Sequence, residues 1–304
     1  MTDTSNDNQR SEHRKCYICN SDKLRILERY HAAGLVKCTN CGFVFSKWIP
    51  TTEFLIAFYN EYPEYQHWNA ITSMRYKQII EGFEKYRQTN NLLEVGSGEG
   101  FFLNQAKAHN WNVYGTEFID RFIQRCRERG IIMHKGKLDV SNYAPQSMDI
   151  IIWIEVLEHI NDPVEELKKF RTLLRPGGIV YLTTPNFNSI SRHSLKERLN
   201  LISYPNHLAY YTPATLKYLF EHNGFKKVRI QTTGVSPGRI IAALKRSRGE
   251  KNNIPTVETQ QIDEPLREKI ESNTFLKFAR NMANEMLTIT GTGDSLKGIF
   301  QKAG

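Results

Sequence analysis

The sequence predicts an α/β protein in which a doubly wound sheet follows a small cysteine-containing module. Three observations lead to this prediction. Short apolar runs alternate with helical patterns from about residue 71 onward. A turn rich in glycine, "LLEVGSGEGFFL", joins one of these runs to the next helix. Two Cys-x2-Cys pairs lie near the N-terminus. The 304 residues are enough for one sizeable core and a satellite domain.

The composition limits the class of protein. Of the residues, 40% are hydrophobic, which argues against wholesale disorder. No run approaches the roughly 20 apolar residues of a membrane span. The N-terminal stretch "MTDTSNDNQRSEHRK" lacks an apolar signal core, so we expect a soluble, cytoplasmic protein. The net charge of +9 has two explanations, a solvated surface or an anionic partner.

The first module spans residues 15–48 and contains four cysteines. Cys16 and Cys19 form one pair, Cys38 and Cys41 form the other, and 18 residues separate the pairs. This spacing is typical of a zinc ribbon, in which four thiolates surround one ion and leave no open position for water. We therefore expect a structural zinc site that supplies much of the module's stability. Iron with the same ligands, or disulfides, are the alternatives.

The chain divides into four predicted parts. Residues 1–14 are a disordered tail, 15–48 the zinc ribbon, 49–88 an aromatic linker with N-terminal helices, and 89–304 the main domain. The linker "FSKWIPTTEFLIAFYNEYPEYQHWN" either packs one module onto the next or covers a substrate pocket. A helix over residues 71–86 follows it. Cys126, on a later helix, is expected to be a small buried residue.

The glycine turn is the main candidate for a ligand site. "NLLEV" predicts a buried strand and "FFLNQAKAHN" predicts the helix after it, so the three glycines form a strand-to-helix turn where a ligand approaches bare backbone. A second strand ends in Glu117, 21 residues beyond Gly96, where an acid suits the hydroxyls of a ribose. Glu94, beside the turn, would repel a pyrophosphate. It suits a ligand with an amino group, such as S-adenosylmethionine.

Further strands and helices continue the wound pattern. "MDIIIWIEVLEH" predicts a strand buried on both faces, and Glu155 and His159 follow at its carboxyl end, where ligands bind in such sheets. Asp162 and Pro163 begin the next helix, as a cap and a first residue. "RPGG" ends that helix, and "IVYLTTP" and "KKVRIQTTG" predict two more strands.

The motifs "LLEVGSGEGFF", "GTEF", "MDIIIWIEVLEHINDP" and "LLRPGGIVYLTTPN", in this order, resemble class I S-adenosylmethionine-dependent methyltransferases. The likeness covers about residues 75–235 and is greatest to the ubiquinone-biosynthesis-like small-molecule branch. The cysteine pairs and "CGFVFSKWIP" are similar to methyltransferases of sugar and polysaccharide gene clusters. The resemblance implies a seven-stranded Rossmann-like sheet. Its last strand, "DSLKGIFQK", returns antiparallel after a helical insertion over about residues 236–291, which caps the pocket or mediates self-association.

The resemblance also implies roles for single residues. Those expected to contact the cofactor, from its methionyl group through its ribose to its adenine, are Glu94, Gly96, Gly98, Gly100, Glu117, Phe118, Leu138, Asp139 and Glu155. A sugar hydroxyl is a weak nucleophile, so a general base helps. His159 and His207 are the candidates; the alternative is that His159 shapes its loop and His207 packs at a helix entry.

These features predict an S-adenosylmethionine-dependent methyltransferase with a structural zinc ion. Its acceptor is a small molecule, a hydroxyl of an anionic sugar nucleotide or polysaccharide precursor. One alternative is an RNA methyltransferase whose ribbon binds nucleic acid. Another is a non-catalytic module that binds S-adenosylmethionine without turnover. The acceptor, the methylated atom and the oligomeric state stay open at this point.

Overall fold

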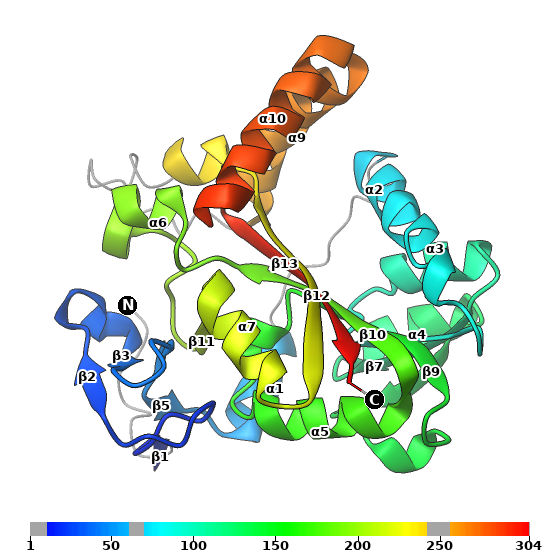
Figure 1. Cartoon of the computed structure of the whole chain (residues 1–304), viewed down its shortest axis with the longest axis horizontal. Coiled ribbons are helices and arrows are strands. Elements are labelled where there is room, and N and C mark those ends of the chain that lie inside the picture. Colours follow the sequence, from blue (N-terminus) through cyan, green and yellow to red (C-terminus); the bar gives the residue numbers. More distant parts are fainter. Residues whose placement is uncertain (1–10, 61–69, 242–255, 304) are drawn as a thin grey trace.

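A seven-stranded sheet forms the centre of the computed structural model, which describes residues 11–60, 70–241 and 256–303. The strand order is β12-β13-β10-β9-β6-β7-β8 (Figure 1). This arrangement confirms the predicted doubly wound α/β class. The strands are β6 (Asn91–Val95), β7 (Asn112–Glu117), β8 (Ile132–Lys135), β9 (Met148–Ile154), β10 (Leu174–Pro185), β12 (Phe225–Thr233) and β13 (Ser295–Lys302).

The sheet is mixed. Strands β10, β9, β6, β7 and β8 are parallel, whereas β13 runs antiparallel between β10 and β12. The predicted antiparallel return of "DSLKGIFQK" is therefore confirmed. Strand β10 begins earlier than expected, because "RPGG" belongs to it, with an irregular register between Leu174 and Ile179.

Helices cover both faces of the sheet. On one face, α2 (Ala70–Glu81), α3 (Phe101–Ala108) and α4 (Asp120–Glu128) pack on Leu92, Ile150 and Ile152. On the other, α5 (Pro163–Leu173) and α7 (Pro213–Glu221) pack on Leu93, Ile151 and Trp153. Successive residues of β9 enter opposite cores, so the strand is apolar throughout, as expected for a sheet covered on both sides.

The helix boundaries follow local chemistry. The Asp162 carboxylate accepts a hydrogen bond from the Glu165 amide at 3.0 Å, and Pro163 opens α5, as predicted. The helix predicted over residues 71–86 is shorter: α2 ends at Glu81, and a 3-10 turn, η3 (Glu84–Tyr86), follows Gly82. Glycine weakens a helix interior, which accounts for the break.

The cysteine module forms its own small sheet. Strands β2 (Leu24–Ile26), β3 (Leu35–Cys38) and β4 (Val44–Ser46) are antiparallel, and η2 (Glu28–Ala33) connects the first two. A fourth strand, β11 (Ala209–Tyr210), pairs with β4 but comes from the main domain. The module and the domain therefore share a sheet, which the sequence did not predict.

Parts of the N-terminal region differ from expectation. The predicted disordered tail, 1–14, is corrected at its end, because β1 (Ser11–Glu12) pairs with β5 (Trp48–Ile49). Residues 1–10 lie outside the described residues. The aromatic stretch is described only as far as α1 (Thr52–Asn60), so neither reading of it is tested.

The predicted insertion contains two long helices. Helices α9 (Thr256–Ser272) and α10 (Thr274–Thr290) lie side by side and project from the sheet (Figure 1). Shorter elements complete the described chain: η4 (Val140–Asn142), η5 (Leu157–His159), α6 (Ile190–Leu195) and η6 (Lys196–Arg198). In the described ranges, no helix is long and apolar enough to cross a membrane.

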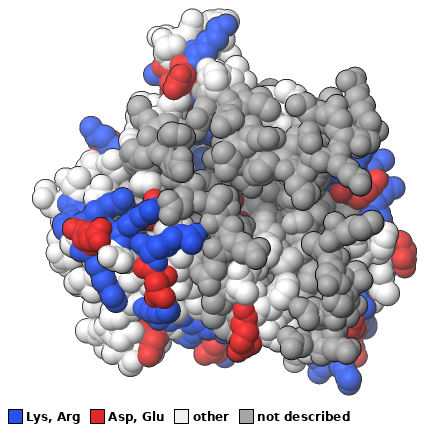
Figure 2. Space-filling view, turned by 180° about the vertical axis from the view of Figure 1, so that it is seen from behind, with Lys and Arg blue, Asp and Glu red and all other residues white. Residues whose placement is uncertain are grey.

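Charges are mixed on the described surface. On the side seen in Figure 2, Lys and Arg side chains gather on one flank with Asp and Glu among them. Helix α4 carries the densest basic stretch of the sequence. It buries Phe122, Ile123 and Cys126 and exposes Arg127. That stretch is therefore the solvated face of an amphipathic helix.

Candidate active site and metal centre

The glycine turn lies between the end of β6 and the start of α3. Gly96, Gly98 and Gly100 all have positive φ, at 70°, 51° and 69°. A Cβ on Gly96 would lie 2.7 Å from a methyl of Val156, and one on Gly100 would lie 2.4 Å from the Cys126 sulfur. A Cβ on Gly98 would meet nothing within 4 Å. Packing thus requires two of the glycines, and the third borders open space where a ligand fits.

Cys126, on α4, packs against this turn. Its side chain is fully buried, and its thiol lies 3.7 Å from the Gly98 carbonyl oxygen. The prediction of a small buried residue is confirmed. A larger side chain here would displace Gly100.

Glu117 ties the end of β7 to the glycine turn. Its Oε2 accepts a hydrogen bond from the Gly98 amide at 2.8 Å. Its Oε1 accepts from the amides of Phe118, at 2.7 Å, and Ile119, at 3.1 Å. These contacts fix the carboxylate beside the turn, and Oε2, which accepts only one of them, keeps a lone pair for a further donor. Phe118 is half-buried next to it.

Glu94 is buried at the end of β6 and its Oε2 has no hydrogen-bond partner among the described atoms. Burial raises the pKa of Glu94 well above its usual value, and the charge of Glu117 raises it further. A buried carboxylate oxygen without a partner costs free energy, which a cationic ligand would recover. The ammonium group of S-adenosylmethionine has the charge that this oxygen requires, and the space beside Gly98 is open.

Glu155 lies at the carboxyl end of β9 with a positive φ of 51°. Its amide donates to the Thr183 carbonyl oxygen at 2.9 Å, and the Thr183 hydroxyl donates to Glu155 Oε1 at 2.7 Å. Such a backbone conformation is rare for a non-glycine residue and is held here by β10.

Two tyrosines that the sequence analysis missed lie near these acids. Burial, above all, raises the pKa of Tyr76 on α2, and the charges of Glu94 and Glu155 add to it. Burial and the charge of Glu155 do the same for Tyr181 on β10. In the sequence, the two tyrosines looked like ordinary apolar positions of a helix and a strand. The sequence does not reveal that they lie near the acids, because the residues come from separate elements.

Leu138 and Asp139 do not join this group. Leu138 is buried in the core that contains Leu93, on the sheet face opposite Glu94. Asp139 caps the turn η4 instead: its Oδ1 accepts from the Ser141 amide at 2.9 Å and from the Ser141 hydroxyl at 2.8 Å. That this pair contacts adenine stays a prediction.

The two candidate bases, His159 and His207, lie together. Their rings are 5.1 Å apart and meet edge to face. Nδ1 of His159 contacts the Asn206 carbonyl oxygen, and Nδ1 of His207 lies 2.7 Å from the Leu201 carbonyl oxygen. Because a carbonyl only accepts, Nδ1 carries the proton in each ring, which leaves Nε2 as the basic atom. Burial lowers the pKa of His159 to about 4 and that of His207 to about 3.

The histidines and Glu155 belong to opposite sides of the sheet edge. Glu155 accepts from Thr183, whereas buried Glu158 accepts from the Thr184 hydroxyl at 2.8 Å. Adjacent side chains of a strand point to opposite faces. Glu155 thus lies on the side of Glu94, which we call the Glu94 face. Glu158 and His159 lie on the side of the cysteine module, the Glu158 face.

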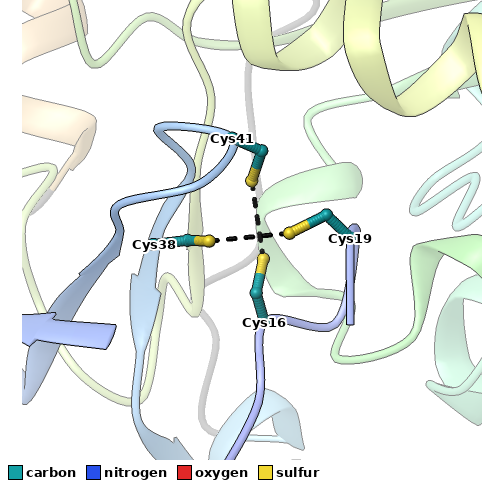
Figure 3. A group of neighbouring side chains, drawn as sticks. All are labelled: Cys16, Cys19, Cys38 and Cys41. Atoms are coloured by element: carbon teal, nitrogen blue, oxygen red, sulfur yellow. Dashed lines mark hydrogen bonds between the residues drawn. The ribbon is translucent and has the colours of Figure 1, made fainter. Parts of the chain in front are cut away.

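The four cysteines of the module converge from two turns (Figure 3). The Cys16 and Cys41 sulfurs are 3.6 Å apart, those of Cys19 and Cys38 are 3.5 Å apart, and all four lie within 4.8 Å of one another. A tetrahedral site with Zn–S distances of about 2.3 Å has sulfurs about 3.8 Å apart. The cysteines are free rather than bridged by disulfides. The donor set therefore fits a zinc ion.

Comparisons with known proteins agree with this geometry. Residues 65–230 match the family model described as "Methyltransferase domain". Ubiquinone biosynthesis O-methyltransferases of Yersinia pestis and Yersinia pseudotuberculosis are each 28% identical over 139 residues, 42% of this chain and 55% of theirs. The chain thus spans about half the length of the curated relatives it matches.

A solved structure shows the same fold. A SAM-dependent methyltransferase from Archaeoglobus fulgidus superposes with a TM-score of 0.51 at 18% identity, over 83% of this chain and 100% of that one. At this identity the likeness concerns the fold alone. The match to the family model covers more than half of the sequence. The chain therefore belongs to the class I S-adenosylmethionine-dependent methyltransferase family.

Proposed function

We propose that the protein transfers the methyl group of S-adenosylmethionine to a hydroxyl of a small anionic acceptor, a sugar nucleotide or a polysaccharide precursor. The observation that carries the methyl-transfer part is the buried, unpartnered Glu94 oxygen beside the open Gly98. The name of the Yersinia relatives, O-methyltransferase, favours oxygen as the methylated atom. The resemblance of the cysteine pairs to sugar-cluster enzymes favours a sugar.

Residues of the glycine turn would hold the cofactor, which supplies a methyl group activated on a positively charged sulfur. Glu94 binds the ammonium group, and the backbone of the turn lies along the methionyl and ribose portions. Glu117, already oriented by three amides, accepts from the ribose hydroxyls, with Phe118 against the adenine. A carboxylate fixed in advance loses little entropy on binding, so this arrangement favours tight association.

The Glu94 face would also orient the acceptor. Tyr76, Tyr181 and Glu155 lie beside Glu94, so an acceptor among them meets the cofactor from the β10 side. Methyl transfer requires donor and acceptor atoms within about 3–3.5 Å and in line, and such alignment supplies several kcal/mol of rate enhancement. Buried tyrosine rings would exclude water from that line.

The base that removes the hydroxyl proton remains a proposal. His159 and His207 are neutral at pH 7 with Nε2 as the basic atom of each ring, so either is able to accept a proton. Glu155 is a third candidate because it lies on the Glu94 face. We expect replacement of the true base to lower kcat while leaving cofactor affinity unchanged. His159→Ala, His207→Ala and Glu155→Gln, measured side by side, identify it.

The cysteine cluster is proposed to bind a structural zinc ion. Four thiolates complete the tetrahedron, so the ion would join the two Cys-x2-Cys segments of the module and take no part in methyl transfer. Such a site requires reduced cysteines, which favours a cytoplasmic location. Metal analysis of the purified protein, with about one zinc per chain, tests this proposal and separates zinc from iron.

A screen with radiolabelled S-adenosylmethionine tests the proposed reaction. Sugar nucleotides, neutral sugars, quinone precursors and RNA are offered separately, with Glu94→Gln as the inactive control. We expect label in a sugar nucleotide or a related anionic sugar. Label in RNA alone would contradict the proposal, and so would binding of the cofactor without transfer to any acceptor of this set.

A further inference from the structure

Lys297 is a lysine on an internal strand of the sheet. It lies on β13, directly opposite Thr183 of β10 and Gln231 of β12. Residues paired in this way project from the same face, so Lys297 lies on the Glu94 face, next to the threonine that holds Glu155. The side chain is half-buried, and among the described residues its ammonium group forms no hydrogen bond or ion pair.

Three arginines from separate helices lie close enough to Lys297 for their charges to act on it. Arg75 comes from α2, Arg267 from α9 and Arg280 from α10. Burial lowers the pKa of Lys297, the nearby charges of the three arginines lower it further, and Glu155 opposes this effect. Burial and the charges of Arg267 and Arg280 also lower the pKa of Arg75.

In the part of the chain that the structure describes, the acids near these cations are Glu155, Asp263 and Glu271, fewer than the cations they face. Glu271, at the end of α9, lies 3.7 Å from Arg75, 3.8 Å from Lys277 and in contact with Arg280. One carboxylate thus serves three cations. Arg267 is 4.0 Å from Asp263, whose oxygens also accept from Ser236 and Gly238.

An uncompensated group of like charges in a half-buried place costs free energy. The cost disappears when an anion binds among them. Guanidinium groups suit phosphate and carboxylate oxygens because they donate two parallel hydrogen bonds, and an ammonium group adds a point charge. The position indicates which ligand would benefit, since Lys297 is one strand away from β10, which carries Tyr181, and pairs with Thr183, whose hydroxyl donates to Glu155.

We propose that Lys297, Arg75 and Arg280 bind the phosphate or carboxylate group of the methyl acceptor. This inference rests on the proposed function, because it places the anion in the acceptor half of that site. The proposal also gives the inserted helices a function. Helix α9 carries Arg267 and Glu271, and α10 carries Arg280, so the insertion would form one wall of the acceptor site.

The test uses the full-length, metal-loaded protein saturated with S-adenosylhomocysteine. Calorimetry measures binding of UDP-glucose, glucose 1-phosphate, glucuronate and glucose. We expect at least one anionic probe to bind and glucose not to bind. Lys297→Met should weaken the bound probe at least tenfold, whereas Lys297→Arg restores most of the affinity. Lys226→Met, a change of an exposed lysine on β12, is the matched control and should bind like the wild type.

The arms of this experiment separate the two proposals. Binding of S-adenosylhomocysteine should be the same in all variants, because Lys297 lies outside the cofactor half. If wild-type protein does not bind S-adenosylhomocysteine, the proposed function is wrong. If it binds S-adenosylhomocysteine but no anionic probe, the proposed anion site is wrong. The anion site is also wrong if Lys297→Met binds the anionic probes as tightly as the wild type does. The phosphate and carboxylate probes show which anion the site prefers.

Discussion

Glu94 and Glu158 are both buried acids at the carboxyl edge of the same sheet, yet their surroundings differ. On the Glu158 face, the carboxylate accepts from Thr184, the Glu158 carbonyl accepts from the Leu208 amide at 2.8 Å, and the cysteine module closes the region. On the Glu94 face, one carboxylate oxygen of Glu94 has no partner among the described atoms, and Lys297, on the same face of the sheet, forms no ion pair there.

Whether a buried carboxylate has hydrogen-bond partners within the protein indicates whether it stabilises the fold or is available to bind a ligand. A buried polar group that already has its partners contributes to the structure, and a ligand has little to offer it. A buried group without a partner lowers the stability of the free protein and gains when a complementary ligand binds. Glu158 thus helps to build the fold, whereas the unpartnered Glu94 oxygen marks the side of the sheet on which we propose that the cofactor binds.

Removal of the metal should produce the largest effect, confined to the Glu158 face. Structural zinc contributes on the order of 10 kcal/mol in isolated zinc-finger peptides, and the module has little apolar core of its own. A chelator, or Cys16→Ser, should therefore unfold the module and lower Tm. The affinity for S-adenosylhomocysteine should stay within about threefold, because the glycine turn lies on the other face. Thermal unfolding and calorimetry on the same samples measure both quantities.

Circular dichroism shows whether the main sheet remains folded after the metal is removed. If it does and cofactor binding is nevertheless lost, then cofactor binding on the Glu94 face depends on the metal on the Glu158 face. Chelator-treated protein to which zinc has been restored serves as the control.

Replacing Glu94 and Glu158 by glutamine should produce the second-largest effect, a difference between the two variants in affinity for S-adenosylhomocysteine. Glu94→Gln removes the charge that would pair with the cofactor's ammonium group, worth about 1.5–3 kcal/mol, or roughly 10- to 100-fold in affinity. Glu158→Gln keeps an oxygen that accepts from Thr184, so its affinity should stay within about twofold. Titration of both variants with S-adenosylhomocysteine measures this difference. Equal losses in the two variants would refute the division into faces.

The smallest effect concerns pH and the Glu158 face. His159 and His207 hold pKa values of about 4 and about 3, below the usual 6.5, so the unfolded chain takes up protons at a higher pH than the folded one. Their stabilising effect is therefore complete above pH 6.5 and is lost as the pH falls from 6.5 toward 4. We expect a loss of about 1 kcal/mol between pH 7 and pH 6 from the pair. Denaturant unfolding of the wild type and of a His159→Gln/His207→Gln variant checks it; parallel pH profiles would contradict it.

Much of the fold was predictable because its signals are local. The apolar β9, the capped start of α5 and the glycine turn are each specified by neighbouring residues, and the structure places them as expected. The hydrogen bond from the Gly98 amide to Glu117 was not predicted, because the sequence related the two residues only through their spacing. Four cysteines at this spacing converge as the pattern implied.

The rest depends on contacts between distant segments. The pairing of β11 with β4 joins residues from two predicted domains and carries no sequence signal. Asp149 Oδ2 accepts hydrogen bonds from the backbone amides of Gln88, Thr89 and Asn90, each at 2.8 Å. The sequence shows only a polar residue at the start of an apolar strand and gives no sign of these contacts. Lys297 had a signal, a lysine in a strand predicted to lie inside the sheet, but its arginine neighbours come from three helices.

Binding of the cofactor tests the central claim most directly. Calorimetric titration of the metal-loaded wild-type protein with S-adenosylmethionine and S-adenosylhomocysteine should show one site per chain for each, with affinity that falls in Glu94→Gln. If the folded protein binds neither compound, or binds them equally well without the Glu94 charge, then the unpartnered carboxylate is not the recognition element and the assignment of the Glu94 face is wrong.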